Sequence, residues 1–85
     1  MESYRLKNVR FTAIQVSANN IEDIYTWLSP IYKTTITKGL NVARVVIETS
    51  PYHLIANNSD FIAMYITGQV IVRNEEEFNR YFVKV

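Results

Sequence analysis

Apolar and polar positions alternate along much of this chain with the period of β-strands. Residues 9–16 (VRFTAIQV) are rich in β-branched and aromatic side chains, and residues 32–38 (YKTTITK) place Tyr32, Thr34 and Ile36 on one side. A period of two is typical of strands with one buried face. The same alternation, and apolar runs between turn residues, predict further strands over residues 41–49, 52–56 and 61–67. Gly68 breaks the last of these, and the backbone is predicted to be extended again over residues 70–72.

A wider spacing of apolar residues predicts a first helix. The apolar residues Ile21, Ile24, Tyr25 and Leu28 follow one another at the intervals of a single helix face. Asn20 precedes them and is a favourable N-cap residue, and Pro30 predicts the end of the helix.

A second helix is predicted near the end of the sequence. Asn74 is followed three residues later by Glu77, which matches a capping box. The acidic run 75–77 then lies in the first turn, where the helix dipole favours negative charge. The predicted apolar stripe consists of Phe78, Tyr81, Phe82 and Val85.

The predicted order of elements is β-α-β-β-β-β-α in a single domain of residues 1–85. We therefore expect an α+β fold, with a mainly antiparallel sheet of about five strands and two helices packed on it. In segment 41–49 the alternation favours Ala43, Val45 and Ile47 as the core face and leaves Arg44 on the other face.

Charge and composition narrow the functional classes. Nine basic and eight acidic residues give a net charge of +1, which fits neither a general nucleic-acid clamp nor an acidic DNA mimic. A local patch of one charge on the folded surface is still compatible with this balance. The absence of cysteine excludes disulfides and thiolate metal sites. Residues 1–7 have no apolar core, and no apolar run approaches the ~20 residues of a membrane span. We expect a cytoplasmic protein with no membrane partner.

The residue types that carry out catalysis have structural explanations in this sequence. His53 is the only histidine, and no carboxylate lies at a useful spacing for a shared metal. Adjacent residues of the acidic run 75–77 point in different directions on a helix, so they do not converge on one ion. Asp60 lies in a predicted turn that favours such a residue. We therefore predict no enzyme activity, no metal and no cofactor.

Aromatic residues are more numerous than a small core requires. Six Tyr, four Phe and one Trp occur in 85 residues. Exposed aromatics are favoured at protein–protein interfaces and also stack on unpaired bases, whereas half-buried sheet aromatics are the ordinary alternative. The candidate partner-binding residues are Trp27, Tyr32, Tyr52, Tyr65 and Arg44.

Basic residues near the N-terminus raise a second possibility. Arg5, Lys7 and Arg10 form either a solvated end of the chain or an arm that contacts phosphate. A nucleic-acid site would require some of these cations, or Arg44 or Arg73, to converge with exposed aromatics on one sheet face.

Several segments resemble a family of small phage and prophage proteins. That family has a strand of the type V-x-x-E-A-I-Q-W, a segment P-G-D-Y-I and a C-terminal segment G-E-F-Y-P-C-K-P-D-x-F. Similar stretches here are residues 4–16, 56–62 and 68–78, whereas residues 29–45 have no counterpart. Ser59 stands where the family has glycine, and Val72-Arg73 replaces its proline-cysteine pair. The family has no established common activity, so the resemblance carries over no catalytic residue.

The resemblance implies a gene of phage or prophage origin that acts in a bacterial host cell. The expected function is a non-enzymatic protein that binds a host protein or complex and inhibits or redirects it, such as an anti-defence inhibitor of the anti-CRISPR type. Two alternatives remain: a nucleic-acid-binding module, and a phage structural or assembly component that forms homo-oligomers.

Overall fold

Eight strands and two helices follow one another in the computed structural model, which describes residues 1–85. The α+β class and the mainly antiparallel pairing predicted from the sequence are confirmed. The elements are β1 (Glu2–Leu6), β2 (Val9–Gln15), α1 (Ile21–Leu28), β3 (Lys33–Gly39), β4 (Val42–Thr49), β5 (Tyr52–Asn57), β6 (Phe61–Tyr65), β7 (Val70–Arg73), α2 (Glu75–Tyr81) and β8 (Val83–Lys84).

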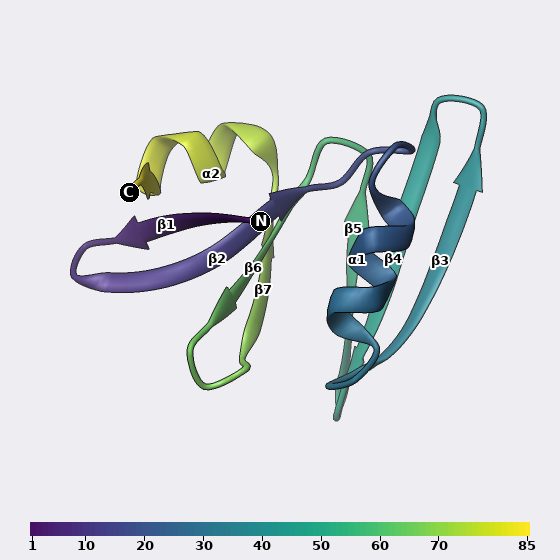
Figure 1. The fold of residues 1–85 in the computed structure, drawn as a ribbon, viewed down its shortest axis with the longest axis horizontal. Coiled ribbons are helices and arrows are strands. Elements are labelled where there is room, and N and C mark those ends of the chain that lie inside the picture. Colours follow the sequence, from purple (N-terminus) through teal and green to yellow (C-terminus); the bar gives the residue numbers. More distant parts are fainter.

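The strands form two sheets, where the sequence predicted one. A five-stranded sheet has the order β7-β6-β2-β1-β8, and a three-stranded sheet has the order β3-β4-β5. Figure 1 shows α1 and the three-stranded sheet on one side of the molecule and the β1–β2 hairpin with α2 on the other. The physical reason for two sheets is that β4 buries an apolar face of its own, which packs across a core instead of extending the first sheet.

The main core lies between α1, the three-stranded sheet and one face of the five-stranded sheet. The predicted alternation in β4 is confirmed, since Ala43, Val45 and Ile47 are at most 2% exposed while Arg44 is exposed. The ten buried residues of this cluster are Val16, Ile21, Ile24, Leu28, Ala43, Val45, Ile47, Ala56, Ile62 and Val70.

A second, aromatic core lies on the opposite face of the five-stranded sheet, beneath α2. The Phe78 ring stacks on Phe61 with centroids 4.0 Å apart and on Phe82 with centroids 4.3 Å apart. The predicted stripe of α2 is only partly correct, because Tyr81 and Val85 are both 57% exposed. The helix ends before Phe82, whose extended backbone turns the chain into β8 and carries the following residues away from the core.

The two predicted helix caps differ in the structure. The Asn74 side chain accepts a hydrogen bond from the Glu77 backbone N–H at 2.8 Å, as predicted. Asn20 precedes α1, but its side chain does not cap the helix. Its Oδ1 instead accepts from the Ser17 N–H at 3.0 Å, and its amide donates to the Gln15 carbonyl at 2.7 Å. Asn20 therefore fixes the chain between β2 and α1.

Two stretches form hairpins that the sequence did not predict. No strand was predicted before residue 9, but residues 2–6 form β1 and pair with β2 because Tyr4 and Leu6 alternate onto the aromatic core. A break at Gly68 was predicted between residues 61–67 and the extended segment 70–72, but not a reversal of the chain. The chain instead turns there with Gly68 at φ +92°, and the Gly68 N–H donates to the Tyr65 carbonyl at 2.8 Å. This positive φ suits glycine and lets β7 fold back on β6.

Candidate binding site

The five predicted partner-binding residues do not form one surface. The Tyr32 hydroxyl donates to the Gly68 carbonyl at 2.7 Å, and Tyr32 packs on the main core. Tyr52 is 72% exposed at the start of β5, and Arg44 lies on the outer face of the three-stranded sheet. Trp27 on α1 and Tyr65 on β6 are both half-buried and border one depression. The structure thus brings together two of the five.

That depression is an open recess of about 290 Å³ between the β1–β2 hairpin and α1, which we call the hairpin cleft. It combines an aromatic side chain, hydroxyl groups, a cation and exposed apolar surface. Its lining residues are Ser3, Arg10, Phe11, Thr12, Trp27, Met64, Tyr65 and Ile66.

Strand alternation explains how the hairpin contributes to the cleft. Ser3 pairs directly with Thr12, and Arg5 pairs directly with Arg10, so these four side chains point to the same face of the sheet. The last turn of α1 brings Trp27 to this face. The Tyr65 ring, in contrast, packs against Phe11 on the α2 side, so Tyr65 only borders the cleft.

The charges on the hairpin are not compensated. Arg5 and Arg10 oppose each other across the strands, and neither forms an ion pair or a side-chain hydrogen bond. Like charges directly opposite each other destabilise a sheet. Of the nine lysines and arginines, the four ion-paired ones lie elsewhere, namely Lys33, Lys38, Arg80 and Lys84. The hairpin therefore presents a positive face with no internal anion.

The one carboxylate on the hairpin is already occupied. Glu2 accepts a hydrogen bond from Lys84 at 2.7 Å, and this bond lowers the pKa of Glu2 and raises the pKa of Lys84. Burial raises the pKa of Tyr4, whose hydroxyl also donates to Glu2 at 3.3 Å. Because Glu2 and Tyr4 alternate to the α2 side of β1, this group does not neutralise Arg5 or Arg10.

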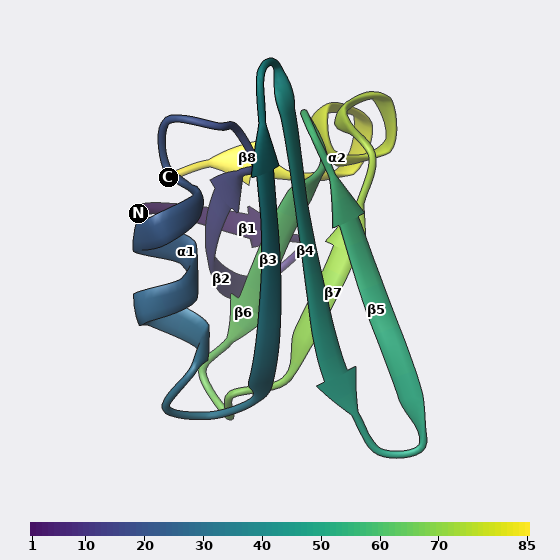
Figure 2. The same cartoon turned by 90° about the vertical axis from the view of Figure 1, so that its right-hand side faces the viewer.

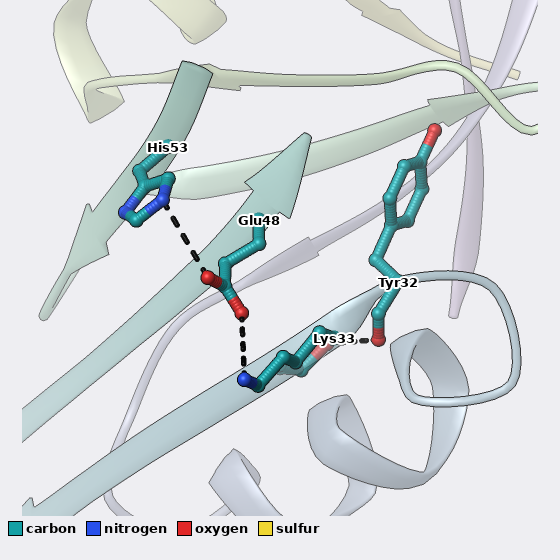
Figure 3. A network of polar contacts seen from close by, with 5 residues as sticks. Tyr32, Lys33, Glu48 and His53 are labelled. Carbon is teal, nitrogen blue, oxygen red and sulfur yellow. Dashed lines mark hydrogen bonds and ion pairs between the residues drawn. The ribbon is translucent and has the colours of Figure 1, made fainter. Parts of the chain in front are cut away.

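The outer face of the three-stranded sheet carries a second polar group. Glu48 Oε2 lies 3.6 Å from Lys33 Nζ, and Glu48 Oε1 lies 3.5 Å from His53 Nε2 (Figure 3). The sequence indicated no carboxylate partner for His53, and cross-strand pairing supplies one by placing Glu48 opposite it. No group of three or more metal-ligating side chains converges here or elsewhere in residues 1–85.

Nothing covers the outer face of this sheet in the fold (Figure 2), but its polar groups satisfy one another. Besides the Glu48 group, the Arg44 Nε donates to Asn57 Oδ1 at 3.0 Å across β4 and β5. Arg44 and Tyr52, both predicted to bind a partner, belong to this face and its edge. The face is therefore a weaker candidate than the hairpin cleft, where neither the lining residue Arg10 nor its cross-strand neighbour Arg5 has an ion-pair partner.

The residues missed by sequence reasoning are those that the hairpin register brings to the cleft. Ser3, Thr12, Met64 and Ile66 were not predicted, although Ile66 is 90% exposed in the β6–β7 turn. One signal was available: Tyr4 and Leu6 alternate before Lys7-Asn8, and the alternation resumes after it, which is the pattern of a two-residue hairpin.

No helix of the structure has the length and apolarity that crossing a membrane requires. No protein-family model, curated protein or solved structure matches this chain. The resemblance to phage proteins therefore stays a prediction, and the geometry of the hairpin cleft is the basis for any functional proposal.

Proposed function

We propose that this chain is a non-enzymatic binding protein that holds a macromolecule of its host at the hairpin cleft. The opposed pair Arg5 and Arg10 carries the proposal. A fold gains nothing from two adjacent cations without an anion, whereas a charged partner gains two charge-assisted hydrogen-bond donors.

The remaining titratable groups support binding over catalysis. Asp60 Oδ2 accepts from the Asn57 N–H at 2.8 Å, and Glu75 Oε2 accepts from Gln15 Nε2 at 2.6 Å. His53 lies beside Glu48 on an open sheet face and not in the cleft. Each candidate acid or base thus has a structural role away from Trp27 and the arginines, and we assign the cleft to recognition.

A capture experiment tests this assignment. The immobilised protein is incubated with bacterial lysate, and the wild type is compared with the R5Q/R10Q double variant and with R44Q. We expect the double variant to lose most of the captured material and R44Q to retain it, because Arg44 lies on the outer face of the other sheet. Equal capture by the wild type and the double variant would overturn the assignment.

Self-association is a second candidate, favoured by one observation. Val42 and Ile55 are 53% and 51% exposed on the uncovered face of the three-stranded sheet. The free edge strand β3 nevertheless carries Lys33 and Lys38, and edge lysines discourage strand addition between copies. Light scattering decides the matter, because a strict monomer at high concentration removes this candidate.

A further inference from the structure

We propose that the ligand of the hairpin cleft is a single-stranded nucleic acid, with its phosphates on Arg5 and Arg10 and an unpaired base against Trp27. This inference rests on the proposed function, and it names the chemical class of the partner.

The hairpin supplies the side chains that we expect to contact the phosphates. Guanidinium groups present planar forks of donors that match phosphate oxygens. Arg5 and Arg10 present two such forks side by side, with the hydroxyls of Ser3 and Thr12 as the next cross-strand pair on the same face. Lys7 lies in the turn of the same hairpin and has no ion pair. The donors therefore follow the length of the hairpin, as a strand of phosphates requires.

Helix α1 supplies the aromatic side chain that we expect to stack on a base. Trp27 lines the same recess as Arg10, and Ile66 adds apolar surface that is 90% exposed. An aromatic face next to a cationic groove is the arrangement that binds single strands, because each unpaired base can stack on the aromatic ring. In a duplex the bases are already stacked on one another. A base that reaches a recess between a hairpin and a helix must be unpaired.

The charge distribution favours a nucleic acid over an acidic peptide. A peptide carboxylate would also neutralise the arginines, but it would leave the aromatic part of the cleft unused. No acidic residue lines the cleft, and three consecutive glutamates lie in the first turn of α2. With two or three phosphate contacts, the salt dependence should be shallow, with a slope of about −1.4 to −2 in log K against log salt concentration.

Trp27 provides the readout, because it is the only tryptophan of the chain. The wild type is titrated with an oligothymidylate of about ten nucleotides over a series of salt concentrations, and tryptophan quenching is recorded. We expect saturable quenching with the slope given above. The R5Q/R10Q variant should bind more weakly and lose about 1.4 from the magnitude of the slope. The control R44Q should behave as the wild type.

The contribution of Trp27 is measured with a fluorescein-labelled oligonucleotide, by anisotropy. W27A should bind about 5-fold or more weakly, which is the lower limit expected for one stacked base, and W27F should retain more affinity than W27A. Circular dichroism of each variant establishes that it is folded, and R5Q/R10Q keeps the test decisive if W27A does not fold.

Three results would overturn the inference alone, and a fourth would overturn the proposed function with it. One is the absence of quenching at low salt, and another is equal affinity for a duplex of the same length. The third is binding of polyglutamate as tight as that of oligothymidylate, which would show a protein-type partner and leave the proposed function standing. An unchanged affinity in R5Q/R10Q together with a loss in R44Q would overturn the proposed function as well.

Discussion

Replacing Arg10 with threonine should make the protein more stable while weakening its proposed binding. In the free protein Arg10 faces Arg5 directly and has no carboxylate partner, so the substitution removes a repulsion and no ion pair. Threonine also suits a strand that is open to solvent on one face.

The gain follows from the charge separation. Two unit charges about 6 Å apart in water repel each other by roughly 0.7 kcal/mol. Screening at physiological ionic strength reduces this to about 0.3 kcal/mol, since the Debye length there is about 8 Å. An unfolding entropy of about 2.1 cal/mol/K per residue gives about 0.18 kcal/mol/K for the 85-residue chain. R10T should therefore raise Tm by about 4 °C at low salt and by about 2 °C at physiological salt.

Thermal unfolding followed by circular dichroism at two salt concentrations measures both values. R44T is the matched control, because Arg44 lies between Thr37 and Asn57 in the other sheet and has no cationic neighbour across the strands. R44T should show no gain. A lower Tm for R10T, or a gain that does not change with salt, would refute the claim that Arg5 and Arg10 repel each other.

Three further predictions concern the aromatic core and the chain ends. Phe78→Ala should reduce the free energy of unfolding by about 3–5 kcal/mol because Phe78 is 1% exposed, whereas Tyr81→Ala, at an exposed site, should change it by less than about 0.5 kcal/mol in urea denaturation. Asn74→Ala should cost about 1 kcal/mol by removing the side-chain cap of α2, and Asn74→Ser, which retains a capping oxygen, should restore most of it. The lowered pKa of Glu2 means that its contribution to stability is present above its usual value of 4.5 and is lost as the pH falls through the lower folded value. In Glu2→Gln the free energy of unfolding should therefore fall less steeply than in the wild type as the pH is lowered below 4.5. The same pH dependence in both proteins would show that the bond to Lys84 contributes nothing to stability.

Much of the local structure could be predicted from the sequence, because it depends on near neighbours. The period of two in β4 and the cap at Asn74 were predicted correctly, since burial of one strand face and a three-residue hydrogen bond are local properties. The division into two sheets could not be predicted in this way. It depends on whether β4 extends the first sheet or packs across it, and alternation is the same in both cases.

The residues of the candidate site were also predictable only as far as local sequence determines them. Trp27 and Arg10 were both noted in the sequence, but they are 17 positions apart and line the same recess only in the folded chain. Tyr32 was predicted to contact a partner, yet its hydroxyl is satisfied by Gly68, a residue 36 positions away. Residue type thus indicated which side chains can bind, whereas tertiary packing decided which of them are available.

The placement of two cores on opposite faces of one sheet has a consequence for how the molecule opens. The aromatic core involves α2, β1, β2, β6 and β7, while α1 and the three-stranded sheet belong wholly to the main core. Residues 74–85 can therefore detach without exposing Ile21, Ile24 or Val45. Amide hydrogen exchange should resolve two units, with α2 and β8 exchanging by a sub-global opening and β4 only by complete unfolding. The C-terminal segment would then be the least protected part of the fold, although it carries its most closely stacked aromatic rings.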